Sequence, residues 1–314
     1  MKDKIVIIGA GFVGSTIAYA VMNWGLTSEI VLIDVNEERA EGEAMDLSHG
    51  ASFVKPVNVK SGDYKECSDA RAIVITAGAK QEHGESRLDL IKKNTVVFKN
   101  IIPKIMKYTT DTVLIVVTNP VDILTYVTLK LSDLPYTKVI GSGTVLDTSR
   151  FRYLLSKYCK VNPRNVHAYI IGEHGDSEVA AWSLTNIAGI QFDEYCNISS
   201  QNFPDDFKDI IYNKVRESAY EVIKKKNATY FAVGLSVARI IESIFRDENS
   251  VLTVSSVLRG EYGLNGVAMS LPHVIGIEGI KDVLPLNLST DEKNQFLHSA
   301  DILTENISKL NIDF

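Results

Sequence analysis

The residue of this chain best suited to move a proton is a histidine flanked by glycines. His174 stands in the run Gly172-Glu173-His174-Gly175-Asp176, directly after the apolar residues 168–171. Histidine changes charge near neutral pH, so it can both donate and accept a proton under ordinary conditions. The glycines are typical of a tight turn at the end of a strand, where a cleft would form. A purely structural role is the competing interpretation for any lone histidine.

Two charged residues near the expected start of a helix could complete a site with this histidine. They are Asp147 and Arg150, in the segment 146–152. Asp147 would fix the tautomer of the imidazole and stabilise the imidazolium. Arg150 would bind a carboxylate through two parallel hydrogen bonds, a geometry that lysine cannot reproduce. Helix capping by Asp147 and a surface position for Arg150 are the alternatives, and periodicity does not choose between them.

The polar segment 80–87, with the sequence Lys-Gln-Glu-His-Gly-Glu-Ser-Arg, contains two further candidates. The fixed positive charge of Arg87 can polarise a carbonyl group. Gln81 is neutral and would decide which side chain a substrate may carry. The glycine at position 84 would allow the segment to act as a lid, although a solvent-exposed connection is the simpler interpretation. Asn119, in Thr118-Asn119-Pro120, ends another expected strand, where ligands bind in α/β folds, but a turn explains Asn-Pro equally well.

A glycine fingerprint near the N-terminus predicts a dinucleotide site. Gly9, Gly11 and Gly14 follow an apolar run and open an expected helix, which is the context that the Gly-x-Gly-x-x-Gly fingerprint requires. The first glycine allows the tight turn, the second lets a pyrophosphate approach the backbone, and the third lets the helix pack on the strand. Asp34 ends the next strand, where its carboxylate can bind ribose hydroxyls. Because a carboxylate there repels a 2′-phosphate, we expect NAD rather than NADP.

The elements that must position these residues form two halves. In the first half, short apolar runs at 4–8, 29–33, 72–76, 112–118 and 138–140 alternate with amphipathic stretches such as 87–108 and 121–131. This pattern predicts a doubly wound, Rossmann-type parallel sheet covered by helices on both faces. We therefore place an NAD-binding α/β domain at residues 1–145.

After residue 146 the rhythm changes, and an α+β catalytic domain is expected at residues 146–314. Predicted helices span 148–158, 205–225 and 229–245, and predicted strands span 168–171, 180–187, 251–257 and 267–271. The last helix begins with a capping box, Ser289-x-x-Glu292, and carries apolar residues at helical spacing from Phe296 to Leu310.

Composition excludes several classes of protein. Of the 314 residues, 45% are hydrophobic and 23% charged, with a formal net charge of −6 and no long Lys/Arg block, so a nucleic-acid partner is not expected. Three scattered cysteines indicate neither a disulfide framework nor a metal cluster. No apolar stretch approaches the ~18 residues of a membrane span, and glycines interrupt the only run that imitates a signal peptide. A cytoplasmic protein without a membrane segment is expected.

The motifs together resemble the lactate/malate dehydrogenase family over essentially the full length, and within it the bacterial type of NAD-dependent L-lactate dehydrogenase. Beyond those already described, the supporting runs are Thr76-Ala77-Gly78-Ala79, Thr118-Asn119-Pro120-Val121-Asp122 and Gly141-Ser142-Gly143-Thr144. The resemblance implies that His174 gives and takes the proton of the reaction, with Asp147 as the partner of its ring, and that Arg87 polarises the carbonyl. It also implies the substrate-binding residues Gln81, Arg87, Asn119, Arg150 and Thr229. The implied cofactor-binding residues are Gly9, Gly11, Val13, Gly14, Asp34, Arg39, Tyr64, Gly78, Ala79, Val117, Thr118, Asn119 and Ser142.

The same resemblance implies the reaction, reduction of pyruvate to L-lactate by NADH at the fermentative end of glycolysis. Malate enzymes of the family carry arginine where this chain has Gln81, so pyruvate is favoured over oxaloacetate. Arg152 and His167 match positions that bind fructose 1,6-bisphosphate between subunits in many bacterial relatives, and a homotetramer is expected from the family. Alternatives are a malate or other 2-hydroxyacid dehydrogenase and a catalytically silent NAD-binding protein. The silent protein would be expected to lose one of its reactive residues, which this chain keeps.

Overall fold

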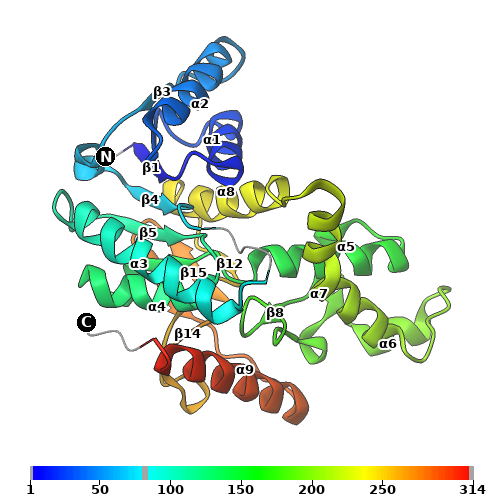
Figure 1. Cartoon of the computed structure of the whole chain (residues 1–314). Coiled ribbons are helices and arrows are strands. Elements are labelled where there is room, and N and C mark those ends of the chain that lie inside the picture. Colours follow the sequence, from blue (N-terminus) through cyan, green and yellow to red (C-terminus); the bar gives the residue numbers. More distant parts are fainter. Residues whose placement is uncertain (1–2, 80–83, 311–314) are drawn as a thin grey trace.

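The computed structural model describes residues 3–79 and 84–310, and its central element is one eight-stranded sheet (Figure 1). The strand order is β14-β13-β6-β5-β4-β1-β2-β3. These strands are β1 (Lys4–Ile8), β2 (Glu29–Ile33), β3 (Asn58–Ser61), β4 (Ala72–Ile75), β5 (Val113–Val116), β6 (Val139–Gly141), β13 (Ser255–Arg259) and β14 (Asn265–Ser270). The strands β1 to β6 pair in parallel, which confirms the predicted Rossmann-type half. β13 joins the sheet antiparallel to β6 through Ser255 and Gly141, and β14 pairs antiparallel with β13.

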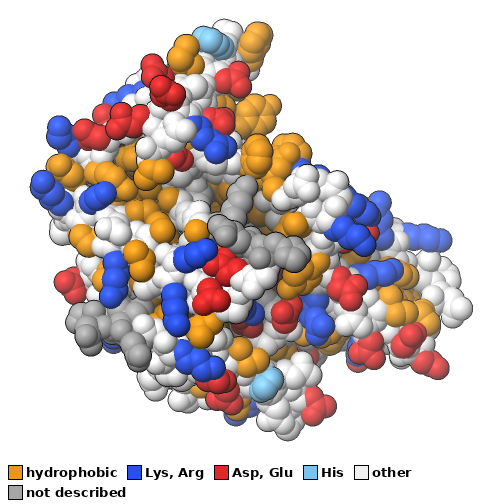
Figure 2. Space-filling view, viewed as in Figure 1, with side chains coloured by type: hydrophobic (Ala, Val, Ile, Leu, Met, Phe, Trp, Pro, Cys, Tyr) orange, Lys and Arg blue, Asp and Glu red, His pale blue; other side chains and the backbone are white. Residues whose placement is uncertain are grey.

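Nine helices are described in the two ranges. They are α1 (Phe12–Trp24), α2 (Glu37–His49), α3 (Arg87–Met106), α4 (Val121–Ser132), α5 (Val145–Cys159), α6 (Phe192–Ile198), α7 (Phe207–Lys226), α8 (Phe231–Phe245) and α9 (Thr290–Ser308). No helix among the described residues is long and apolar enough to cross a membrane. Figure 2 shows lysine and arginine side chains interspersed with acidic ones over one face of the molecule.

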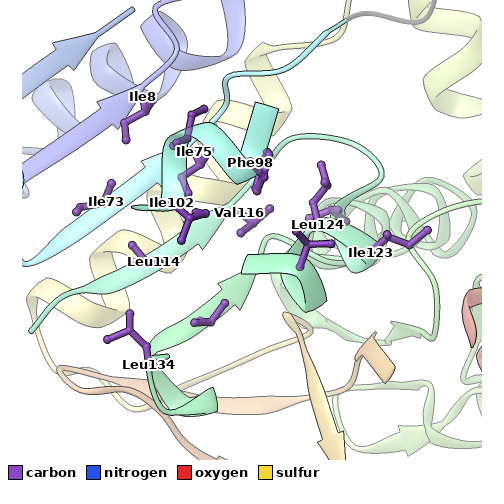
Figure 3. Packing of buried hydrophobic residues seen from close by; sticks show 14 of the residues in the cluster. Ile8, Ile73, Ile75, Phe98, Ile102, Leu114, Val116, Ile123, Leu124 and Leu134 are labelled. Carbon is purple, nitrogen blue, oxygen red and sulfur yellow. The ribbon is translucent and has the colours of Figure 1, made fainter. Parts of the chain in front are cut away.

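The sheet core consists of two hydrophobic clusters, one on each face. Successive side chains of a strand point to opposite faces, so Val6 and Ile8 belong to one cluster while Ile5 and Ile7 belong to the other. The first cluster packs strand residues against α3 and α4, and Figure 3 shows members from each, among them Ile75, Phe98 and Leu124. The second contains residues of α1 and α8. Burial on both faces explains why the strands β1, β2, β4 and β5 are almost wholly apolar.

The second half adds three small sheets. They contain β7 (Val166–His167), β10 (Asn186–Ile187) and β11 (Ile190–Gln191); β8 (Ile170–Ile171) and β9 (Val179–Ala180); and β12 (Ser250–Leu252), β15 (His273–Gly276) and β16 (Gly279–Val283). A third cluster fills the space between strands β7 to β10 and the helices α5, α6 and α7. The predicted division after residue 145 would fall in the first turn of α5, and it stays a prediction.

Two predicted strands are wrong in extent. The expected strand 180–187 is interrupted by a 3₁₀ turn at Trp182–Leu184, which lets the Trp182 ring pack edge-on against Phe151 with centroids 4.8 Å apart. The expected strand 251–257 is two strands, because the chain leaves the sheet of β12 and enters the main sheet at β13. The predicted capping box of α9 is confirmed, since Ser289 and Glu292 bond each other's backbone N–H groups.

Candidate active site

The glycine turn between β1 and α1 is packed too tightly for side chains at two of its three glycines. Gly9 has φ +107°, and a Cβ atom there would lie 2.6 Å from the Ala77 nitrogen. A Cβ on Gly14 would lie 1.9 Å from the Gly9 carbonyl oxygen. At Gly11, in contrast, a Cβ would meet nothing within 4 Å, and no side chain caps α1 at this residue. The N-terminus of α1 therefore has open space beside its first turn, where the helix dipole favours an anion, and this fits the pyrophosphate of a dinucleotide.

Asp34 holds the end of β2 against this turn. Its Oδ2 accepts the Ala10 N–H at 2.7 Å and its Oδ1 accepts the Asn36 N–H at 2.9 Å. The residue lines a cavity of about 660 Å³ that also includes Arg39 and Tyr64. A carboxylate in this place suits ribose hydroxyls, as the fingerprint predicts.

The cavity brings together most of the residues predicted to bind the cofactor. Its lining includes Gly9, Gly11, Val13, Gly14, Asp34, Arg39, Tyr64, Gly78, Val117, Thr118 and Asn119, and also Thr229, which is predicted to bind the substrate. Ala79 and Ser142 are not in this lining. The Ala79 N–H donates to Asn94 Oδ1 at 2.7 Å, and the Ser142 N–H donates to the Val116 carbonyl at 2.8 Å.

The buried Asn94 of α3 is a residue that sequence reasoning missed. Its amide bonds Ala79 through Oδ1 and donates from Nδ2 to the Asn119 carbonyl at 2.8 Å. It therefore ties the segment after β4 to the turn after β5. Thr229, which also lines the cofactor cavity, lies in the connection between α7 and α8. The ring of the next residue, Tyr230, stacks on Phe12 with centroids 5.3 Å apart.

His174 and Arg150 share one buried carboxylate. Nδ1 of His174 lies 2.5 Å from Asp147 Oδ2, and Arg150 donates from Nη1 to Asp147 Oδ1 at 2.7 Å. Burial opposes the charge on His174, but the Asp147 carboxylate outweighs it and raises the pKa of the imidazole to about 9. Burial would likewise raise the pKa of Asp147, yet the charges of His174 and Arg150 hold it below its usual value. The structure brings these three predicted residues together, and their roles toward a substrate stay predictions.

A second buried aspartate fixes the backbone of the histidine. Asp122, in the first turn of α4, accepts the His174 N–H at 2.7 Å through Oδ2 and the Ser255 hydroxyl at 2.6 Å through Oδ1. Burial raises the pKa of Asp122 to about 6. In sequence, an aspartate in a first turn is expected to serve its own helix, so nothing pointed to this contact with another segment.

Glu178 is a third acid in this neighbourhood. It is only 3% exposed, and its Oε1 has no hydrogen-bond partner among the described residues. Burial, and then the negative charge of Asp147, raises the pKa of Glu178 to about 9. Burial and the charge of Asp147 therefore both favour the uncharged form of the Glu178 side chain.

The two candidates of the segment 80–87 differ in outcome. Gln81 lies outside the described residues. Arg87 is the first residue of α3, and its Nη2 donates to Oε1 of Glu173, the residue before His174. The role of Arg87 toward a carbonyl group stays a prediction.

The two predicted effector residues belong to neighbouring elements, Arg152 to α5 and His167 to β7. Arg152 donates from Nε to the Ala168 carbonyl at 3.0 Å, and its guanidinium covers the Tyr169 ring at 5.4 Å. It lines a cavity of about 350 Å³ together with Arg239. His167 is exposed on β7. Among the described residues, no cluster of acidic, histidine and cysteine side chains has the arrangement of a metal site.

Comparison with known proteins gives two family matches that cover almost the whole chain. The lactate/malate dehydrogenase NAD binding domain matches residues 3–141, and the lactate/malate dehydrogenase alpha/beta C-terminal domain matches residues 144–312. Among similar proteins, L-lactate dehydrogenase 1 of Clostridium acetobutylicum is 57% identical, over 98% of this chain and 99% of its own length. The L-lactate dehydrogenase of Thermoanaerobacter sp. is 56% identical, over 99% of this chain and 100% of its own.

Solved structures agree with these matches. A lactate dehydrogenase from a Medee basin deep-sea metagenome library has a TM-score of 0.96 and 42% identity, with 99% of both chains covered. The minor L-lactate dehydrogenase of Enterococcus mundtii, in its ligand-bound form, gives the same TM-score, identity and coverage. The glycine turn, the Asp34 carboxylate and the cavity around them fit the NAD that the family model names. With both the NAD binding domain and the alpha/beta C-terminal domain of the family matched, this chain belongs to the lactate/malate dehydrogenase family and is an NAD-dependent dehydrogenase.

Proposed function

We propose that this protein is an L-lactate dehydrogenase that reduces pyruvate reversibly to L-lactate. The observation that carries the proposal is the sharing of Asp147 by a proton-carrying histidine and a carboxylate-binding arginine. The names of the similar proteins support the choice of substrate. The reaction consumes one NADH and one proton for each pyruvate.

His174 is the proposed proton donor. Its Nδ1 is bonded to Asp147, so Nε2 is the nitrogen left to face a substrate. With a pKa of about 9 the imidazole is protonated at neutral pH, as pyruvate reduction requires. When NADH is bound, it supplies the hydride that the keto carbon accepts. His174 gives its proton to the keto oxygen, and in the reverse direction neutral His174 takes the hydroxyl proton of L-lactate.

Arg150 is the proposed partner of the substrate carboxylate. One of its Nη atoms is bonded to Asp147, and the remaining N–H groups of the fork are left for the substrate. The same Asp147 thereby orients both the group that binds one end of pyruvate and the group that protonates the other. Asn119 and Thr229 would line the pocket, because both face the same cavity.

Arg87 would stabilise the negative charge that develops on the keto oxygen. Such a charge grows in the transition state, so a cation placed beside it lowers the barrier rather than only tightening binding. The guanidinium would have to leave Glu173 to reach that position.

Gln81 is the proposed selector of the substrate side chain. A neutral amide offers no charge for the second carboxylate of oxaloacetate, and burying an unpaired carboxylate is costly. The test is NADH oxidation by the purified protein with pyruvate and with oxaloacetate, for the wild type and for Gln81→Arg. We expect the wild type to prefer pyruvate and the variant to shift toward oxaloacetate. Preference of the wild type for oxaloacetate would overturn the assignment in favour of a malate dehydrogenase.

Regulation is a second part of the proposal. Arg152 and His167 would bind fructose 1,6-bisphosphate between subunits of a homotetramer. Support comes from the packing of their two segments, since Arg152 Nε donates to the carbonyl of Ala168, the residue after His167. Facing cations from two subunits would repel until an anion lies between them. We expect bisphosphate to lower the KM for pyruvate, and the sedimentation velocity of the protein with and without bisphosphate tests the assembly.

A further inference from the structure

The backbone on both sides of Arg87 is anchored. Ser86 is the N-cap of α3, and its hydroxyl accepts the Asp89 N–H at 3.2 Å. The Asp89 carboxylate in turn accepts the Ser86 N–H at 3.3 Å, which completes a capping box. Each cap of this kind stabilises the first helical turn. The freedom that remains at Arg87 therefore lies mainly in its long side chain, which is 40% exposed.

The group that receives this side chain is a buried and fully organised carboxylate. Glu173 is 1% exposed; its Oε1 accepts Arg87 Nη2 and its Oε2 accepts the Ser177 hydroxyl at 2.5 Å. The backbone N–H of Glu173 donates to Ser299 of α9 at 2.9 Å. Gly175 provides the space, because a Cβ atom there would lie 3.0 Å from Arg87 Nη2 and 3.1 Å from the Glu173 carboxyl carbon.

The bound guanidinium lines a different cavity from the one that contains the proposed cofactor and substrate residues Asn119 and Thr229. With Glu173 it lines a cavity of about 410 Å³ that also includes Tyr212 of α7 and Gln295 of α9. The described lining of the cofactor cavity does not include Arg87. The ring of His174, in contrast, is bonded to Asp147. The consecutive residues Glu173 and His174 therefore have different partners, the cation Arg87 and the carboxylate of Asp147.

We propose that Glu173 is a positioning residue that stores Arg87 away from the substrate. This inference rests on the role proposed for Arg87 in polarising the keto group. A buried carboxylate that loses a cationic partner is poorly compensated, so the contact with Glu173 competes with the contact to substrate. The substrate must supply the difference from its own binding. Glu173 thereby sets how easily Arg87 reaches the carbonyl and how readily it returns when product leaves.

The test is a double-mutant cycle of Glu173→Gln and Arg87→Ala, read as kcat and KM for pyruvate at saturating NADH. Glutamine keeps the size of the side chain and an acceptor for Ser177, but removes the charge that holds the guanidinium. We expect the KM of Glu173→Gln to fall about threefold, with kcat unchanged or lower, because a half-exposed ion pair contributes modestly. In the Arg87→Ala background the same substitution should have no effect on KM.

Glu292→Gln is the matched control, since it makes the same change at a buried glutamate that bonds Ser183 rather than Arg87. We expect it to alter Tm without altering KM. A KM for Glu173→Gln that is unchanged or raised, or an effect that persists without Arg87, would overturn the storage role. Pyruvate turnover by the wild type separately tests the proposed function. Its absence would remove both proposals, whereas normal turnover with an unaffected Glu173→Gln removes the storage role alone.

Discussion

Asp147 bonds His174 through one carboxylate oxygen and Arg150 through the other, at 2.5 Å and 2.7 Å. The two cations it holds are the proposed proton donor and the proposed clamp for the substrate carboxylate. Their separation is thus set by the width of one carboxylate group and the first turn of α5. Pre-organisation of this kind lowers the entropy cost of bringing reacting groups together.

Replacing Asp147 by asparagine should move the pH profile of the reaction. Burial lowers the pKa of His174 and Asp147 outweighs that effect, so without the carboxylate the pKa must drop from about 9 toward acid. We expect the alkaline limb of kcat/KM for pyruvate to lie near pH 9 in the wild type and to shift to lower pH in Asp147→Asn. The maximal rate should fall by about 10²–10⁴. The NADH dissociation constant, measured by fluorescence, should change little; an unshifted alkaline limb would show that another group titrates there.

The geometry of the glycine turn predicts different stability effects for two alanine substitutions. In Gly14→Ala the new Cβ would overlap the Gly9 carbonyl, so both Tm and NADH affinity should fall. In Gly11→Ala the Cβ meets no protein atom, so Tm should be kept while NADH binding weakens. Gly42→Ala, inside α2 with open space around it, is the control and should raise stability by about 0.5–1 kcal/mol. Calorimetry with NADH titration separates the three; equal NADH affinity in Gly11→Ala and wild type would place the pyrophosphate elsewhere.

Asp34→Ser should weaken discrimination between the two nicotinamide cofactors. The substitution removes the negative charge that would repel a 2′-phosphate and the acceptors for the N–H groups of Ala10 and Asn36. We expect the KM for NADH to rise about tenfold, as for loss of a charge-assisted hydrogen bond, while the KM for NADPH falls. Initial rates with both cofactors measure this. A parallel rise in both values would mean that Asp34 only holds the turn in place.

His273 should contribute to acid unfolding. It is fully buried, and burial lowers its pKa from 6.5 to about 4, so the folded protein keeps the ring neutral while the unfolded chain takes up a proton below pH 6.5. Stability is therefore lost as the pH falls from 6.5 to 4, by up to ~3 kcal/mol. Urea unfolding of His273→Gln over this range should show a flatter pH dependence than that of the wild type. The variant will also be less stable at pH 7, because the ring bonds Ser256 and the Leu271 carbonyl, so the slope rather than the absolute value is decisive.

The predictions from sequence were correct where a local pattern is compatible with only one local structure. The glycine spacing and the apolar strands predicted the parallel sheet, because only glycine fits the turn and only apolar residues suit strands buried on both faces. Strand β3 was missed since only Val59 of its four residues is apolar, and it lies at the edge of the sheet. The break at Trp182 was missed because the 3₁₀ turn, which directs the Trp182 ring toward Phe151 in the core, leaves no pattern of apolar and polar residues that would distinguish it from a strand.

The site shows the same division. His174, Asp147 and Arg150 stand in motifs whose spacing already suggests chemistry. Asp122 and Glu173 do not, since each acts on a segment distant in sequence: Asp122 bonds a backbone N–H 52 residues away, and Glu173 bonds a side chain 86 residues away. Such contacts depend on how the helices pack, and a single sequence carries no record of that packing.

The junction of β6 and β13 restricts where the chain of this enzyme can be divided into fragments. A fragment that ends at residue 145 would leave the outer edge of β6 without its neighbour, and an uncovered edge strand is a template for association with other chains. Chimeras that join the first half of one relative to the second half of another must therefore match across this seam. The contact between Gly143 and the backbone of Val254 and Ser255 leaves no room for a larger residue there. Chimeras in which the two halves are exchanged as independent units should aggregate, unless β13 and β14 come from the same parent protein as the sheet that they complete.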